Sequence, residues 1–130
     1  MTARVSAESL VKSPFCVVGV GEMTVRVRGS GVGGRCQEFV CRMALRFGAY
    51  ERDVVAVARA TDGRDFVKGI AGGWSDNETV RRAREHGIDL ASVVSDNDSY
   101  AALHELQQLI GGGRTGWNLC DVYLVLVGGS

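Results

Sequence analysis

The sequence predicts a single compact α/β domain, with a mixed β-sheet and helices packed on it. Segments typical of strands alternate along the chain with segments typical of helices, instead of clustering by type. The chain has 130 residues, the length of one domain with a sizeable core. Hydrophobic residues make up 45% and charged residues 23%, close to the globular average, so a disordered or fibrous class is not indicated.

The predicted strands are short apolar or alternating runs. Residues 15–20 are apolar and residues 23–28 alternate, so we expect them to form a hairpin. Residues 54–60 form an apolar run of the length of a buried strand. Residues 122–127 form another near the end of the chain.

The predicted helices are marked by periodicity and capping residues. In residues 35–47, apolar side chains recur every four positions while Glu38, Arg42 and Arg46 share the other face, which predicts an amphipathic helix. A capping-box pattern opens a helix over residues 75–86.

Residues 96–99 cap a last helix, and a short turn over residues 89–95 precedes it. The buried stripe of this last helix is predicted to consist of Leu103, Leu106 and Ile110.

Residues 28–39 carry the most informative motif, because four glycines and Arg35 stand between a predicted strand and a predicted helix. Glycine N–H groups can approach a ligand closely, a helix N-terminus presents unpaired N–H groups, and an arginine adds bidentate charge. The motif therefore predicts a turn that binds a carboxylate or phosphate. The alternative is a glycine-rich turn that binds nothing.

Two other loops carry polar candidates. Asp62 follows a predicted strand, where a ligand-contacting side chain would lie, although an Asx-turn explains it equally well. Thr115 and Asn118 lie in a second glycine-rich loop and could hold a substrate hydroxyl or carboxylate, or form a plain turn. Our hypothesis is that these loops converge with the glycine turn.

Several classes of function are disfavoured. Gly29, Gly31 and Gly34 satisfy G-x-G-x-x-G, but Asp53 precedes the next strand instead of ending it, so a dinucleotide fold is not predicted. A Walker lysine motif is absent, and the four cysteines lack metal-ligand spacing, so we predict no metal site and reduced, mostly buried thiols.

Charge and the N-terminal residues bear on partners and location. Fifteen basic and fifteen acidic residues balance, so neither nucleic acid nor a membrane is an expected partner. Residues 1–14 look loosely attached and lack the apolar core of a secretory signal, so we expect a cytoplasmic protein. The domain itself is expected over residues 15–130.

Five sequence blocks lie in residues 21–27, 33–39, 61–63, 96–100 and 115–121. In their order and spacing they closely resemble the MOFRL domain, the C-terminal domain of class II glycerate 2-kinases, and the resemblance covers nearly the whole chain. These enzymes, also labelled hydroxypyruvate reductases, transfer a phosphoryl group from ATP to the 2-hydroxyl of D-glycerate with a divalent metal. Their active site lies between this domain and a larger N-terminal one.

The resemblance implies site residues by position. Arg35 corresponds to the arginine of the Gly-Gly-Arg motif and would stabilise charge on the phosphoryl group or substrate. The implied substrate- or phosphate-binding residues are Gly33, Gly34, Gln37, Glu38, Asp62, Thr115 and Asn118. ATP and Mg²⁺ are implied only by the resemblance, and we expect neither to be tightly bound.

The chain also departs from the family pattern. Val32 and Cys36 replace a usual lysine and asparagine, residues 68–72 lack a usual acid, and Arg114 replaces a small or polar residue. Two accounts remain open. The chain is either a glycerate kinase half-site that needs a partner domain, or a non-catalytic module that binds a small anion or a protein. A homo-oligomer is also possible.

Overall fold

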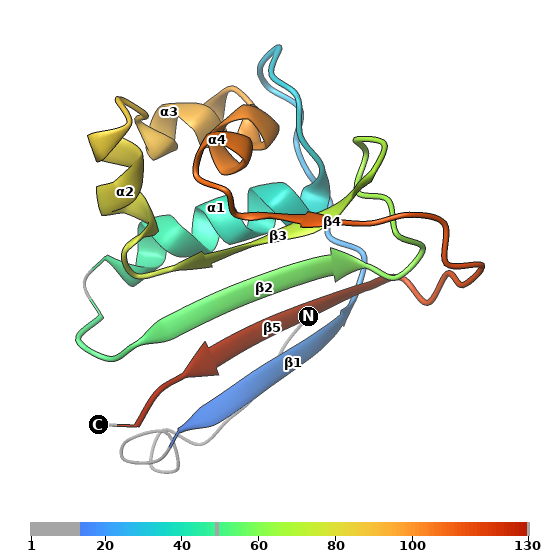
Figure 1. Ribbon diagram of the computed structural model, residues 1–130, viewed down its shortest axis with the longest axis horizontal. Coiled ribbons are helices and arrows are strands. Elements are labelled where there is room, and N and C mark those ends of the chain that lie inside the picture. Colours follow the sequence, from blue (N-terminus) through green and yellow to red (C-terminus); the bar gives the residue numbers. More distant parts are fainter. Residues whose placement is uncertain (1–13, 49, 130) are drawn as a thin grey trace.

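The computed structural model describes residues 14–48 and 50–129, and within them five strands form one sheet whose helices cover one face (Figure 1). The strands are β1 (Phe15–Gly21), β2 (Val54–Ala60), β3 (Ile70–Asp76), β4 (Leu109–Gly111) and β5 (Asp121–Val127). The helices are α1 (Arg35–Phe47), α2 (Thr79–Glu85), α3 (Leu90–Ser95) and α4 (Ser99–Glu105). The predicted α/β class is confirmed. Except for Pro14, the predicted loose segment 1–14 lies outside the described residues.

The alternation of elements along the chain predicted a mixed sheet, but the observed strand order makes neighbouring strands antiparallel. The order is β1-β5-β2-β3-β4, and every neighbouring pair in the described residues is antiparallel. β1 and β2 do run parallel and are joined through α1, as in a crossover unit. The last strand, β5, inserts between them and pairs with both, which a reading along the chain cannot show.

The predicted hairpin over residues 15–28 is wrong in its second half. β1 pairs with β5 instead, from Phe15 opposite Val127 to Gly21 opposite Asp121. Residues 22–28 form no strand. Outside the sheet this segment is bound by Asn97, which donates from Nδ2 to the Arg26 carbonyl at 3.0 Å.

β3 was not predicted as a strand, and the helix expected over residues 75–86 begins only at Thr79. Ser75 belongs to β3 and donates its hydroxyl to the carbonyl of Val40 on α1 (2.6 Å). Asp76 forms a turn just before α2, because its Oδ1 accepts at 2.9 Å from the N–H of Glu78, the N-cap residue. The predicted capping sequence therefore marks a strand end as well as a helix start.

The last predicted helix is shorter than its apolar stripe suggested. α4 ends at Glu105, and Gln107 takes a φ of 57° to turn the chain into β4. Ile110 lies in β4, not on the helix. The predicted turn over residues 89–95 contains α3, whose N-cap Asp89 accepts from the Ala91 N–H at 3.2 Å.

The core lies between the sheet and α1, which lies over β2 and β3 while the shorter helices pack around it (Figure 1). Glycines in β3 permit this close approach. A Cβ at Gly73 would lie 3.0 Å from Leu103 Cδ1 and 3.2 Å from Val40 Cγ2.

α1 has 13 residues, and no helix in the described part of the chain is long and apolar enough to cross a membrane.

Leu103 allows the core to be tested. We expect Leu103→Ala to lower the free energy of unfolding by about 3 kcal/mol, because the side chain is fully buried and its removal leaves a cavity. Leu45→Ala is the matched control, since Leu45 is 40% exposed and its loss should cost less than ~1 kcal/mol. Urea unfolding measures both, and equal losses would contradict the assigned core.

Candidate functional site

The three loops singled out in the sequence meet at one end of the sheet, where β1 and β2 end and β5 begins (Figure 1). The Thr115 hydroxyl donates to the carbonyl of Thr61 at 2.7 Å and so joins the second and third loops. The first loop joins them through Gly34, where a Cβ would lie 2.3 Å from Asp65 Cγ. The hypothesis that the loops converge is therefore supported by the geometry.

Arg35, the first residue of α1, is held by the buried carboxylate of Asp121, the first residue of β5. The guanidinium donates from Nε to Oδ2 and from Nη2 to Oδ1, the latter at 2.8 Å. The Tyr123 hydroxyl also donates to Oδ2 (2.9 Å), and Glu22 lies 3.8 Å from the Arg35 Nε. The Asp121 hydrogen bond and charge raise the pKa of Arg35, so it stays protonated at any pH the fold tolerates.

One edge of this guanidinium remains available. Arg35 uses Nε and Nη2 internally, and Nη1 makes no hydrogen bond to the described residues. Its side chain is 26% exposed. A cleft of about 520 Å³ is lined by two neighbours of this ion pair, Glu22 and Tyr123, but not by Arg35 itself. Arg35 can therefore offer two N–H donors to a ligand while Asp121 fixes its orientation.

The N-terminus of α1 is already occupied by a carboxylate of the protein. Asp65 is completely buried, and it accepts from the N–H groups of Cys36 (3.1 Å) and Gln37 (2.9 Å). The Gln37 side chain donates to Asp65 Oδ2 as well, at 3.0 Å. The donors that a helix N-terminus usually offers to an external anion are thus used internally.

The glycine-rich loop is likewise bound to the protein itself. The Asn97 carboxamide oxygen accepts from the N–H groups of Arg28 (2.6 Å) and Gly29 (3.0 Å), and Asp98 accepts from that of Val32 (3.1 Å). A Cβ at Gly33 would lie 2.0 Å from Ser99 Oγ. The glycines here allow one loop to pack against another, as the non-binding alternative supposed.

Gln37 and Glu38, the next residues of α1, are both buried. Gln37 is fully buried, with its amide on Asp65, and Glu38 is 5% exposed. The Glu38 carboxylate accepts from Asn97 Nδ2 at 2.7 Å and lies 3.4 Å from Arg42 Nε. The prediction that Glu38 lies on the outer face of α1 is therefore wrong, because Asn97, which also binds the N–H groups of Arg28 and Gly29, packs against that carboxylate.

Asp62, Thr115 and Asn118 lie at the surface of the other two loops. The Asp62 carboxylate accepts from the N–H of Arg64 at 3.0 Å, which is the Asx-turn considered from the sequence. The Asn118 carboxamide accepts from the N–H of Cys120 at 3.3 Å, in a turn of its own. Each side chain retains further hydrogen-bonding capacity toward solvent.

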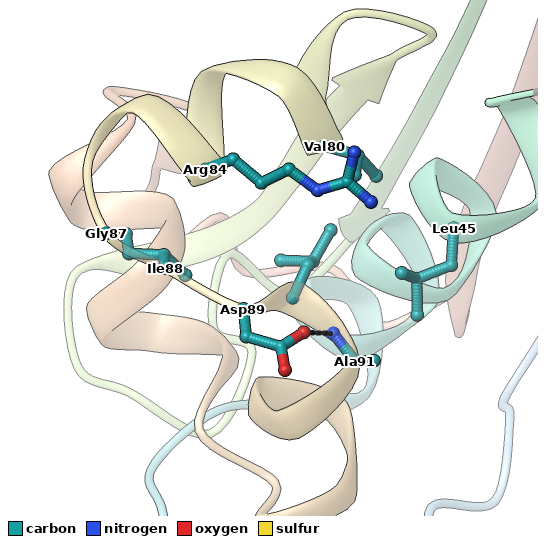
Figure 2. Close-up of a pocket in the computed structure, with 8 residues that line it drawn as sticks. Leu45, Val80, Arg84, Gly87, Ile88, Asp89 and Ala91 are labelled. Carbon is teal, nitrogen blue, oxygen red and sulfur yellow. Dashed lines mark hydrogen bonds between the residues drawn. The ribbon is translucent and has the colours of Figure 1, made fainter.

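Another pocket lies between α1, α2 and α3, away from these loops (Figure 2). Its charged lining residues are Arg84 and Asp89, and the Asp89 carboxylate accepts from the Ala91 N–H (Figure 2). This carboxylate caps α3 and so has a structural role.

Thiols and metal-ligating groups do not add to the site. Cys36 and Cys41 are buried as predicted, but Cys16 and Cys120 are exposed, and all four are free. Burial raises the pKa of Cys41 to about 12, and burial together with the Asp65 charge raises that of Cys36. Within residues 14–48 and 50–129, no three His, Cys, Asp or Glu side chains are placed to hold a metal ion.

Sequence reasoning missed Asp65, Asn97 and Asp121, the residues that build this end of the sheet. Asp121 immediately precedes an apolar strand, a position where a charged residue is usually read as part of a loop. Asp65 stands three residues after Asp62 in the same loop. Asp62 was chosen because it lies nearer the end of the predicted strand. A carboxylate at the start of an apolar strand is a signal that could have identified Asp121, whereas Asp65 and Asn97 lie in loops and carry no such signal.

Comparison with known proteins identifies one family. The family described as the MOFRL family matches residues 15–121. The chain is 35% identical to the glycerate kinase of Rattus norvegicus over 126 residues, which is 92% of this chain and 24% of that protein. It is 34% identical to the D-glycerate 2-kinase of Thermotoga maritima over 117 residues, 90% of this chain and 28% of that protein.

Solved structures agree with the sequence comparison. The crystal structure of glycerate kinase from Thermotoga maritima matches with a TM-score of 0.85 and 33% identity, covering 94% of this chain and 29% of that one. A protein from Pyrococcus horikoshii matches with a TM-score of 0.80 and 34% identity, covering 88% and 26%. The chain thus spans about a quarter of the length of the relatives it matches.

Asp65 and Asp62 form a matched pair for mutation. We expect Asp65→Ala to lower the free energy of unfolding by about 2 to 3 kcal/mol, because it leaves the Cys36 and Gln37 N–H groups without an acceptor in the buried end of α1. Asp62→Ala removes only a turn hydrogen bond and should cost less than ~1 kcal/mol. Denaturant unfolding would contradict the assignment if the order were reversed.

Thiol reactivity tests the buried cysteines. At pH 8 we expect Ellman's reagent to modify two thiols of the native chain rapidly, those of Cys16 and Cys120. Cys36 and Cys41 should react only as the chain unfolds, since burial raises their pKa values and keeps them protonated while the thiolate is the nucleophile. Rapid modification of Cys41, located by peptide mapping, would contradict the placement of α1.

Proposed function

Because the chain belongs to the MOFRL family, we propose that it supplies the C-terminal, substrate- or phosphate-binding half of a site that phosphorylates D-glycerate at its 2-hydroxyl. The observation that carries this proposal is the family match over residues 15–121, whose named relatives are glycerate kinases. The other half of the site would come from a larger N-terminal domain, in accordance with the quarter of each relative that this chain spans.

Arg35 is the residue to which we assign the central role. Its Nε and Nη2 are fixed on Asp121, and its Nη1 is available to a carboxylate or to a phosphoryl group that gains charge during transfer. A guanidinium oriented in advance stabilises such charge without reorganising. Arg35 would therefore both bind substrate and stabilise the transferred group.

The other predicted residues take two different parts in this proposal. Gly33, Gly34, Gln37 and Glu38 are packed against neighbouring groups and would hold the start of α1, and with it Arg35, in position. Asp62, Thr115 and Asn118 lie on the surface of the converging loops and would face the substrate.

ATP and Mg²⁺ belong to the proposal as the phosphoryl donor and its counter-ion. The free Nη1 of Arg35 suits a phosphate oxygen. No group of three or more metal-ligating side chains forms in the described part of the chain, so the metal would be held largely by the nucleotide and the partner domain. When bound, the ion would neutralise phosphate charge.

The partner would also cover apolar surface. Val18, Val20 and Leu126 are 59%, 63% and 44% exposed, and they lie on the face of the sheet away from the helices. A partner domain, or a second copy of the chain, would bury this surface.

The alternative function is a non-catalytic module that binds a small anion or a protein. One observation favours it, because Asp65 and Asp121 already satisfy the two groups most able to attract a substrate anion. Supplying the chain with the larger domain of a glycerate kinase separates the two accounts. ATP-dependent phosphorylation of D-glycerate would support the kinase half-site, and anion binding with no transfer would support the module.

Calorimetric titration with D-glycerate and 2-phosphoglycerate tests the role of Arg35. We expect Arg35→Ala to weaken binding by about tenfold or more, because a bidentate cation is lost. Arg35→Lys keeps a charge beside Asp121, so it guards against simple unfolding, and it should lose affinity too. Arg46→Ala is the control, an exposed arginine in the last turn of the same helix. Unchanged affinity in both Arg35 variants would contradict the proposal.

A further inference from the structure

A second cleft lies at the same end of the molecule, and its charge differs from that around Arg35. Three basic side chains line it, Arg64, Lys68 and Arg114, with Asp62 as the carboxylate beside them. The whole chain has fifteen basic and fifteen acidic residues, so this excess is local. From this cleft we infer that the chain has a phosphate-binding site formed by Arg64, Lys68 and Arg114, distinct from the glycine turn where the sequence placed one.

None of the three cations is neutralised by the fold. In the described residues no carboxylate lies within ion-pair distance of Arg64, Lys68 or Arg114. The Arg64 side chain makes one long hydrogen bond, from Nε to the Phe66 carbonyl at 3.4 Å. By contrast Arg35 has Asp121 and Glu22 as neighbours. An added anion therefore gains more from this cleft than from the glycine turn.

The cations come from two loops that are fastened together. Arg64 and Lys68 precede β3, and Arg114 follows β4. The N–H of Gly112 donates to the Gly69 carbonyl at 2.9 Å. The backbones of the two loops are also in close contact at glycines, since a Cβ at Gly63 would lie 1.8 Å from the Gly113 carbonyl oxygen. Hydrogen bonds and close backbone packing thus fix the base of the cleft before any ligand arrives.

The lining favours an anion with several charges. Glycines contribute half of the eight lining positions, so the backbone itself is accessible next to the cations. The volume, about 610 Å³, accommodates a small phosphorylated molecule or the phosphate chain of a nucleotide. A single carboxylate brings one charge and two oxygens to the three cations, whereas a phosphate brings more charge and at least three oxygens. The ligand class is therefore a phosphomonoester or a polyphosphate.

This inference does not depend on the proposed function, because the cleft and its charge exist whether or not the chain takes part in phosphoryl transfer. If the proposed function also holds, the cleft would receive the phosphate groups while Arg35 contacts the substrate. The two can fail separately, since they involve different arginines, and tripolyphosphate is used only for the cleft.

Two measurements on the full 130-residue chain test the site. Tripolyphosphate is the first probe, in calorimetry and in amide NMR at low salt. We expect binding that weakens with added salt, with the largest amide shifts at Gly63, Gly69 and Gly113. Shifts centred on Gly33 and Gly34 instead, or no binding, would overturn the inference.

Charge-removing variants supply the second readout. The double variant Arg64→Gln, Arg114→Gln should bind tripolyphosphate about tenfold or more weakly. The double variant Arg46→Gln, Arg84→Gln is the matched control, because it also removes two charges, one at the exposed end of α1 and one beside a carboxylate in the separate pocket of Figure 2. It should bind as the unmodified chain does. Equal losses of affinity in both variants would show that net charge alone governs tripolyphosphate binding, which would overturn the inference.

Further probes separate the two sources of phosphate. Tighter binding of ATP and tripolyphosphate than of 2-phosphoglycerate assigns the cleft to a polyphosphate, and the reverse order assigns it to a phosphomonoester. Adenosine carries no phosphate and should cause no shifts at Gly63 or Gly113. If adenosine shifts these amides as strongly as ATP does, the cleft recognises the base and the inference is wrong.

Discussion

The buried carboxylate of Asp65 is the group on which the rest of this end of the molecule depends. It satisfies the first N–H groups of α1 and the side chain of Gln37, and so connects the loop after β2 to the start of the helix. A helix start buried without such a partner would be strongly destabilised. Gly34 is part of the same arrangement, because any side chain there would overlap the carboxylate. Since Arg35 is the next residue, this capping also decides where its guanidinium begins.

Internal anions of this kind decide which parts of the surface remain open to a ligand. Asp65 occupies the helix N-terminus, Asp121 holds the Nε and Nη2 edge of Arg35, and Asn97 with its neighbours binds the glycine loop. What is left is one edge of Arg35 and the uncompensated cations of the neighbouring cleft. The arrangement separates a well-oriented single arginine from a broader basic site, two environments that suit different anionic groups.

Most of the fold class and part of the site could be predicted from local patterns. The limits of α1 and β2 agree with the segments predicted over residues 35–47 and 54–60, because each has a clear hydrophobic period or run. β3 escaped prediction because its glycines lower strand propensity, yet they are required where β3 lies against Leu103 and Val40. β4 has three residues, too few for any periodic signal.

By itself the sequence determined that helices would cover a sheet and that three glycine-bearing loops would carry the polar groups, because periodicity and turn chemistry are local properties. Only the tertiary structure decided which groups partner one another. The insertion of β5 between β1 and β2 brings Asp121 to Arg35 across 86 residues. The close packing of the loops assigns Asp65 to the helix rather than to solvent. Such pairings join residues distant in the chain and follow from packing the whole domain, so no local pattern records them.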